Sequence, residues 1–312
     1  MKGNKPKGNK PSVFIDGEAG TTGLGIRARL DALPQVARRS LPAEHRKDKA
    51  ARRDIIAEVD LVVLCLPDNT THKSAALAGE LGNAAPKLLD ASTAHRVDPD
   101  WTYGFPEMTK DQAGRIAAAA KVANPGCYPT GAIGLLRPLV EAGFIPPDYP
   151  ISINAVSGYS GGGKSMIEAH DRDGGPAFEL YALGLEHKHV AETQLYSGLT
   201  RRPIFVPSVG HFRQGMLVCI PLHLDELPGA PSGTDLHGAL AAHYDGCAYV
   251  KVVPASGNGK IEPEALNDTN QLELSVHANE ARHQAVLVAR LDNLGKGASG
   301  AAVQNLSLML GL

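Results

Sequence analysis

The chain has 312 residues, 43% of them hydrophobic and 21% charged, which is enough for two domains with their own cores. A formal net charge of −2 gives no indication of a nucleic-acid partner. Its 4 cysteines stand far apart without metal-ligand spacing, and neither a signal peptide nor a membrane-spanning apolar run is visible. We therefore expect a cytoplasmic protein with no metal, no membrane span and no nucleic-acid partner.

The N-terminal half alternates between two kinds of pattern. Residues 1–12 mix Lys, Gly, Asn and Pro without apolar periodicity, which predicts a disordered tail. Short apolar runs at 13–16, 61–66 and 87–90 then alternate with stretches of helical periodicity as far as Val122. This alternation predicts an α/β domain, a Rossmann-like parallel sheet with helices on both faces.

The pattern of apolar and polar residues changes after a helix that is expected to begin near Cys127. Several of the later strands alternate polar and apolar residues, as expected for a sheet with one open face. A helix is expected at 235–244 between these strands, and another at 298–310 after them. We predict an α+β domain with a mostly antiparallel sheet, whose strands lie at 151–156, 204–209, 216–223, 248–253, 271–277 and 285–291.

A glycine pattern follows the first expected strand and opens the first helix, which is expected over 24–33. Glycines allow a backbone to approach phosphates closely, and a helix N-terminus supplies N–H donors and positive potential. A plain glycine-rich turn is the alternative. The strand–turn–helix context favours a dinucleotide pyrophosphate, bound by Gly17, Gly20, Thr21, Thr22 and Gly23.

The residues at and after the end of a short strand expected near 36–41, the second in the chain, indicate which dinucleotide is bound. No acidic residue ends that strand to accept a ribose 2′-OH. Ser40 and Arg46 lie there instead and suit a 2′-phosphate, which favours NADP over NAD, although a solvated basic loop is the alternative. Pro67, after the apolar strand, and Asn293, in a glycine-rich loop before the last helix, complete the predicted cofactor contacts.

The turn Asn124-Pro125-Gly126-Cys127 places a cysteine between a short apolar run and the start of a helix. Unpaired N–H groups and the positive end of the helix dipole favour a thiolate there and can hold an oxyanion. The alternative is a buried cysteine that packs as a small hydrophobe. We predict that Cys127 is a nucleophile.

Two further groups carry chemistry. His189 and Glu192 share a helix face at i, i+3, and His187 precedes them. No third metal ligand is spaced nearby, so a general acid/base is the better interpretation. Arg96 follows the strand at 87–90, at the edge where parallel sheets present ligands, and suits a phosphate or carboxylate; pairing with Asp98 is the alternative.

Residues 158–165, Gly-Tyr-Ser-Gly-Gly-Gly-Lys-Ser, match the phosphate-binding P-loop pattern. The segment lies among strands expected to be antiparallel, and no convincing Asp for magnesium follows it. An ATP-binding protein is therefore kept as an alternative. We expect this loop, with Ser157 and Gly158, to contact a substrate instead.

In their order along the chain, these motifs resemble those of the N-acetyl-gamma-glutamyl-phosphate reductases, most closely their shorter type. The resemblance covers nearly everything after residue 12 and includes the closing segment 293–300. The aspartate-semialdehyde dehydrogenases rank second, because they typically have Asn directly before the cysteine where this chain has Gly126. Both groups share a fold and a mechanism.

The resemblance implies an NADP(H)-dependent oxidoreductase of arginine biosynthesis. It would reduce N-acetylglutamyl 5-phosphate to the 5-semialdehyde through a thioester on Cys127 and release inorganic phosphate. His189 matches the acid/base, with His187 as second choice, and Arg96 matches a phosphate ligand. Ser157, Gly158 and Glu192 would lie at the substrate.

The resemblance also implies an organisation into domains. An NADP-binding domain would comprise residues 13–125 with 295–312, and residues 126–294 would form the catalytic and oligomerisation domain of a homo-oligomer. One departure bears on Arg96. The longer family members usually carry an acidic residue and an aromatic before this arginine, where this chain has Ala94 and His95.

Overall fold

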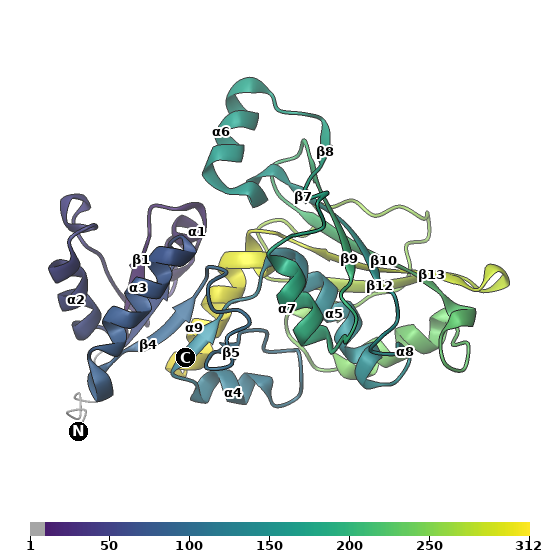
Figure 1. Cartoon of the computed structure of the whole chain (residues 1–312), viewed down its shortest axis with the longest axis horizontal. Coiled ribbons are helices and arrows are strands. Elements are labelled where there is room, and N and C mark those ends of the chain that lie inside the picture. The colour runs from purple at the N-terminus through teal and green to yellow at the C-terminus, as the bar shows by residue number, and fades with distance from the viewer. Residues whose placement is uncertain (1–9) are drawn as a thin grey trace. The chain divides into compact units, whose positions relative to one another are not determined.

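The computed structural model describes residues 10–312, which form two compact units (Figure 1). The first unit extends to Pro125 and also includes Ser299–Leu312, whereas the second comprises Gly126–Ala298. Residues 295–298, predicted to belong with the cofactor domain, thus fall in the second unit.

The predicted tail lies outside the described residues up to position 9. At its other end the prediction extends too far, because Ser12 already belongs to the first strand. Its N–H and Oγ both donate to the Asp60 carboxylate, at 2.8 and 2.7 Å, and this contact holds the chain in the sheet.

In the described part of the first unit, a sheet has the strand order β2-β1-β3-β4-β6-β5, and all its neighbouring pairs are parallel. The inner strands are buried on both faces and therefore appear in the sequence as continuous apolar runs. The predicted Rossmann-like sheet is confirmed. Its strands are β1 (Ser12–Asp16), β2 (Ala37–Arg39), β3 (Leu61–Leu64), β4 (Lys87–Asp90), β5 (Thr102–Tyr103) and β6 (Lys121–Ala123).

Helices cover both faces of this sheet, as the alternation of side chains along each strand requires. Val13 and Ile15 of β1 join a core with Ile26, Leu306 and other residues of α1, α4 and α9. Phe14 points the other way, into a second core formed with α2 and α3. These helices are α1 (Thr21–Asp31), α2 (Lys49–Glu58), α3 (Asp68–Gly79), α4 (Gln112–Ala118) and α9 (Gly300–Leu310).

The second unit contains a mixed sheet in the order β11-β12-β13-β10-β7-β9-β8. The pairs β11–β12 and β7–β9 are parallel and the others antiparallel, so the predicted mostly antiparallel sheet is confirmed. Its strands are β7 (Ser152–Gly158), β8 (Phe178–Leu180), β9 (Ile204–Gly210), β10 (Met216–His223), β11 (Val250–Val252), β12 (Leu272–Asn279) and β13 (Gln284–Leu291).

Helix α5 (Cys127–Glu141) packs on β10 and β13, with α7 (His189–Ser197) and α8 (Gly233–His243) beside it (Figure 1). Small residues allow this close approach, because a Cβ on Gly131 would lie 2.8 Å from a methyl of Val218. The Tyr244 hydroxyl also donates to the Gly134 carbonyl at 2.8 Å. These contacts fix the position of the helix that begins at Cys127.

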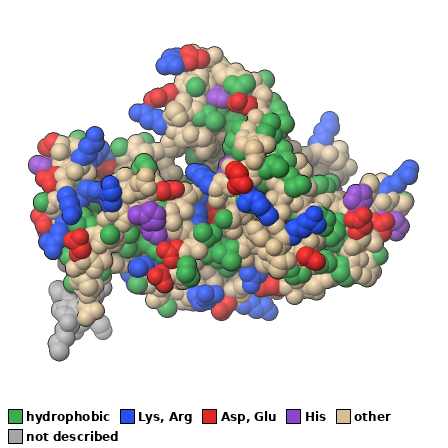
Figure 2. Space-filling view, in the orientation of Figure 1, with side chains coloured by type: hydrophobic (Ala, Val, Ile, Leu, Met, Phe, Trp, Pro, Cys, Tyr) green, Lys and Arg blue, Asp and Glu red, His purple; other side chains and the backbone are tan. Residues whose placement is uncertain are grey.

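Among residues 10–312, no helix has the length and apolarity needed to cross a membrane. The same residues contain no cluster of three His, Cys, Asp or Glu side chains arranged to hold a metal ion. On the face drawn in Figure 2, basic and acidic side chains are interspersed, in keeping with the small net charge of the chain.

Candidate active site

Cys127 is the first residue of α5, and no side chain caps this helix. Gly126 before it is extended, and the first turn contains no acidic residue. The first N–H groups of a helix have no partner within it, so this turn offers donors and positive potential beside the half-buried thiol.

A glycine-rich loop lies directly against this cysteine. A Cβ on Gly297 would lie 2.8 Å from the Cβ of Cys127, so the thiol's position requires glycine there. Asp292, fully buried, anchors this loop by accepting the Leu294 N–H and the Gln214 amide, at 2.8 and 2.7 Å. Asp292 was not among the predicted site residues, although a polar residue directly after a buried strand was a signal.

His189 and Glu192 lie at the start of α7, and both are buried. The His189 Nε2 is 4.0 Å from Glu192 Oε1, while the other carboxylate oxygen accepts the Gly126 N–H at 3.1 Å. Glu192 therefore links the imidazole to the turn that carries Cys127. The structure brings these three predicted residues together.

His187 supports His189 from the preceding turn. Its Nδ1 accepts the backbone N–H of His189 at 3.1 Å, which places the proton of a neutral His187 on Nε2. The centroids of the two imidazole rings are 4.7 Å apart, and both rings contact Tyr128. Because Glu192 faces His189, the geometry favours His189 as the acid/base.

Two phenols that the sequence analysis missed line the same region. The Tyr128 hydroxyl donates to the Ser208 carbonyl at 3.0 Å, and Tyr181 lies 3.3 Å from it. Burial raises the pKa of Tyr128 well above its usual range and that of Tyr181 to about 12. Both phenols are therefore neutral at physiological pH and act as hydrogen-bonding groups.

Ser157, Gly158 and Asn293 meet at a junction of loops in the second unit. The Ser157 hydroxyl donates to the Gly158 carbonyl at 2.9 Å. Asn293, 2% exposed, accepts the Gly215 N–H at 2.8 Å and donates to the Ser160 hydroxyl at 2.9 Å. Both ends of its amide thus hold loops together, a bracing role that the predicted cofactor contact did not include.

The first residues of the segment that matches the P-loop pattern are bonded to a neighbouring turn of the protein. A P-loop turns its backbone N–H groups toward phosphates. Here the N–H groups of Gly158, Tyr159 and Ser160 donate to carbonyls of the 212–215 turn at 2.9–3.0 Å. The exposed Lys164 lies 3.6 Å from Glu168 on its own helix. The ATP-binding alternative therefore loses its support.

In the first unit, the three glycines of the predicted cofactor turn differ in how closely the fold surrounds them. Gly17 has φ +96°, and a Cβ there would lie 2.4 Å from the Cys65 carbonyl oxygen, so the fold itself requires this glycine. Gly23 is equally confined. The exposed Gly20 is not, because its nearest neighbour would be 3.5 Å from a Cβ. Backbone left open at an uncapped helix start fits a pyrophosphate.

The residues predicted for a 2′-phosphate gather around one carboxylate. Ser40 and Arg46 both donate to the buried Glu18, at 2.9 and 2.7 Å, and Arg38 lies 3.7 Å from it. The Arg38 Nε also donates to Asp31 at 2.8 Å, so both guanidinium groups are paired with carboxylates of the protein. Glu18 and Arg38 were missed. Pro67, exposed, is the residue before α3 at the end of β3.

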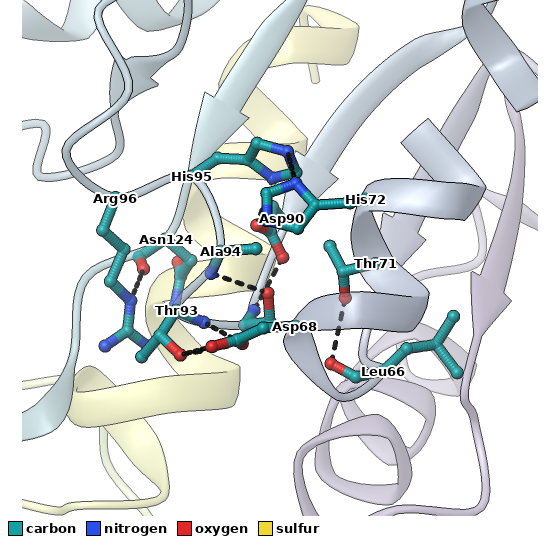
Figure 3. A network of polar contacts seen from close by, with 11 residues as sticks. Leu66, Asp68, Thr71, His72, Asp90, Thr93, Ala94, His95, Arg96 and Asn124 are labelled. Atoms are coloured by element: carbon teal, nitrogen blue, oxygen red, sulfur yellow. Dashed lines mark hydrogen bonds and ion pairs between the residues drawn. The ribbon is translucent and has the colours of Figure 1, made fainter. Parts of the chain in front are cut away.

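Arg96 lies in the loop after β4 and is 8% exposed (Figure 3). Its Nε donates to the Asn124 carbonyl at 3.0 Å, three residues before Cys127 in the sequence. The loop places a cation at the carboxyl edge of the parallel sheet, where such sheets bind ligands.

Comparison with known proteins places these features in a family. Residues 17–116 match the NAD binding domain of semialdehyde dehydrogenases, and residues 127–293 match their dimerisation domain. A relative from Burkholderia cenocepacia, named N-acetyl-gamma-glutamyl-phosphate reductase, is 52% identical over 96% of this chain and 97% of its own. The N-acetyl-gamma-glutamyl-phosphate reductase 2 of Pseudomonas putida is 50% identical over 96% of this chain and 97% of its own.

Solved structures share the fold at much lower identity. Aspartate semialdehyde dehydrogenase II from Vibrio cholerae has a TM-score of 0.73 at 17% identity, covering 96% of this chain and 98% of that one. The enzyme from Francisella tularensis has a TM-score of 0.74 at 11% identity, over 97% of this chain and 100% of that one. The motifs, the two domain matches and the close relatives together show that the chain belongs to the N-acetyl-gamma-glutamyl-phosphate reductases of the semialdehyde dehydrogenase family.

Proposed function

We propose that this protein reduces N-acetylglutamyl 5-phosphate to N-acetylglutamate 5-semialdehyde with NADPH and releases phosphate, as a cytoplasmic step of arginine biosynthesis. The observation that carries the proposal is Cys127 at the uncapped start of α5, with Glu192 between its turn and His189. The substrate comes from the names of relatives about 50% identical to this chain.

The reaction begins with attack of the Cys127 thiolate on the acyl carbonyl carbon. N–H groups in the first turn of α5 hold the resulting oxyanion, and one such donor typically lowers the barrier by about 3 kcal/mol. The carbon–oxygen bond to phosphate then breaks, phosphate leaves with the electron pair, and a thioester remains. Arg96 supplies the positive charge that holds the phosphoryl group.

The thioester is then reduced to the aldehyde. NADPH supplies a hydride when it is bound. His189, as imidazolium, donates a proton to the developing hemithioacetal oxygen and takes it back as the carbon–sulfur bond breaks. Cys127 returns as a thiolate. Glu192, whose Oε1 is 4.0 Å from Nε2, orients the imidazole.

The first unit supplies the residues that would hold the cofactor. Gly20 and the first turn of α1 suit the pyrophosphate, since this helix start has no side-chain cap. A Cβ on Gly20 would meet no protein atom closely, but it would occupy space that the pyrophosphate needs. Arg46, Arg38 and Ser40 suit a 2′-phosphate. The match of residues 127–293 to a dimerisation domain supports a homo-oligomer.

An assay in the reverse direction tests this function. N-acetylglutamate semialdehyde, NADP⁺ and phosphate should yield NADPH, and omission of phosphate should stop multiple turnover. Aspartate semialdehyde serves as the matched substrate control and should react far more slowly. Turnover without phosphate, or a preference for aspartate semialdehyde, would contradict the proposal. ATP should change neither the rate nor NADPH fluorescence.

A further inference from the structure

A chain of three polar side chains lies at the end of β4 (Figure 3). The Asp90 carboxylate, fully buried, is 2.7 Å from His95 Nδ1, and His95 Nε2 is 3.0 Å from His72 Nδ1. His95 is 5% exposed, whereas His72 is exposed. An ionised carboxylate accepts, so His95 donates from Nδ1, and the neutral form accepts at Nε2 from His72.

His95 is also held by ring packing. Its ring stacks on the buried Trp101 with 4.1 Å between centroids and 15° between planes. The edge of His72 closes a second side, at 4.6 Å between centroids and 79°. The imidazole is thus held by Asp90 at Nδ1, by His72 at Nε2 and by Trp101 against its face.

The contacts of Asp90, His95, Arg96 and Asn124 close into a ring. Arg96 directly follows His95, and its Nε donates to the Asn124 carbonyl at 3.0 Å. The Asn124 N–H donates in turn to the backbone carbonyl of Asp90 at 2.7 Å. Asp90 therefore binds His95 through its side chain and Asn124 through its backbone carbonyl. His95 is thus connected to Arg96 by the chain itself and, through Asp90, to Asn124, whose carbonyl accepts from Arg96.

The intervening backbone is fixed as well. Asp90 accepts the Ser92 N–H at 2.7 Å, and Asp68 accepts both the N–H and the hydroxyl of Thr93. The loop from β4 to Arg96 thus has little freedom before the guanidinium is placed. A cation that is already oriented does not lose rotamer freedom when it binds an anion.

We propose that His95, held by Asp90, is a positioning residue for Arg96 and thereby sets the affinity of the enzyme for the phosphoryl group. This inference rests on the proposed function. His95 acts through the neighbouring guanidinium. Without its bond to Asp90, the loop loses one of its anchors and Arg96 samples other rotamers.

The test compares two variants in the reverse assay. His95→Phe keeps a ring against Trp101 and removes the donor to Asp90, whereas His95→Asn keeps a donor near the Nδ1 position. We expect His95→Phe to raise the KM for phosphate roughly tenfold or more, while the KM for NADP⁺ stays within about twofold. His95→Asn should recover most of the phosphate affinity. A phosphate KM raised as much in His95→Asn as in His95→Phe would contradict a role for the hydrogen bond to Asp90.

A double-mutant cycle separates positioning from a general structural role. In an Arg96→Ala background, His95→Phe should have almost no further effect on the phosphate KM, because the group it positions is gone. Equal effects in both backgrounds would overturn the proposal. His72→Ala, which removes the exposed end of the chain, is the control and should change the phosphate KM by less than about twofold.

Failure of the proposed function would look different. The unmodified enzyme would then show no phosphate-dependent formation of NADPH. If His95→Phe does not fold, as judged by thermal unfolding, His95→Asn and Asp90→Asn carry the same cycle. Asp90→Asn should raise the phosphate KM and lose that effect in the Arg96→Ala background, and an unchanged phosphate KM would contradict the inference.

Discussion

Helix α1 in the first unit and helix α5 in the second both begin directly after a glycine, but the surroundings of their first turns differ. Neither α1, after Gly20, nor α5, after Gly126, has a side-chain cap or an acidic residue in its first turn. Gly20 is exposed, so the start of α1 is open to a ligand. At α5, the residues after Cys127 are buried, and Glu192 already accepts the Gly126 N–H.

The difference shows how one electrostatic device serves two purposes. A helix N-terminus favours negative charge wherever it occurs. At α1, that charge would arrive with a ligand and leave with it, so the glycine turn must remain accessible. At α5, the thiol belongs to the protein, and the surrounding residues enclose the place where charge develops. The first site is therefore expected to govern binding, and the second the chemical step.

The largest effect is expected at α5. Cys127→Ser should lower turnover by at least about 10³-fold, because no thioester forms without the thiolate. NADPH binding, measured by fluorescence, should be unchanged. Cys219→Ser is the control and should retain activity. Loss of NADPH binding in Cys127→Ser would show that the two helix starts do not have separate roles.

Labelling with a thiol reagent near neutral pH sharpens the same contrast. Burial raises the pKa of the Cys219 thiol, so a smaller fraction of Cys219 is thiolate near neutral pH than of an ordinary cysteine. Cys127 should react first, because the start of α5 favours its thiolate. Peptide mass spectrometry after brief alkylation provides the readout, and faster modification of Cys219 would contradict the assignment.

The acid/base pair comes next in size. His189→Ala should lower turnover by about 10²- to 10⁴-fold, the usual contribution of a positioned acid/base. His187→Ala should have a smaller effect, since its Nδ1 supports the His189 backbone and Glu192 faces His189. Steady-state rates across pH for both variants provide the measurement. A larger defect in His187→Ala would exchange their roles.

At α1, two alanine substitutions should have opposite consequences. Gly20→Ala should weaken NADPH binding by about tenfold, or 1.4 kcal/mol, without lowering thermal stability, because the fold leaves space for its Cβ. Gly17→Ala should cost about 1–3 kcal/mol of stability, since φ there is +96°. Titration calorimetry and thermal unfolding measure the two effects. Tight NADPH binding by Gly20→Ala would contradict the pyrophosphate site.

The smallest effect is expected at Arg46, which lies in the exposed segment after β2. Arg46→Ala should weaken NADPH binding by roughly fivefold, because its side chain is 41% exposed and solvent screens its charge. NADH binding should not change, since NADH has no 2′-phosphate. The ratio of the two dissociation constants is the readout. An equal loss for both cofactors would remove Arg46 from the 2′-phosphate site.

The sequence predicts elements best where burial produces a pattern. The apolar run of β3 and the alternation in β10 were both found. In contrast, β8 (Phe178–Leu180) is exposed throughout and β5 has two residues, so neither leaves a periodic signal. Helix α1 begins at Thr21, ahead of the predicted Leu24, because glycine backbone geometry sets its start before the apolar pattern begins.

The candidate site follows the same logic. Cys127 and His189 could be predicted as candidates because their local motifs carry chemical signals. The contacts of Glu18, Asp90 and Asp292 were missed, because their partners are brought together by the fold. Asn293 was predicted as a cofactor ligand from its loop, and its observed partners, Gly215 and Ser160, lie far away in the sequence.

Trapping of the acyl-enzyme tests the central claim most directly. The protein would be mixed with N-acetylglutamate semialdehyde and NADP⁺ in the absence of phosphate, quenched in acid and digested for mass spectrometry. The account predicts an N-acetylglutamyl group on the peptide that contains Cys127, and its loss when phosphate is added before the quench. NADPH formation with Cys127 unmodified, or with the acyl group on another residue, would contradict it.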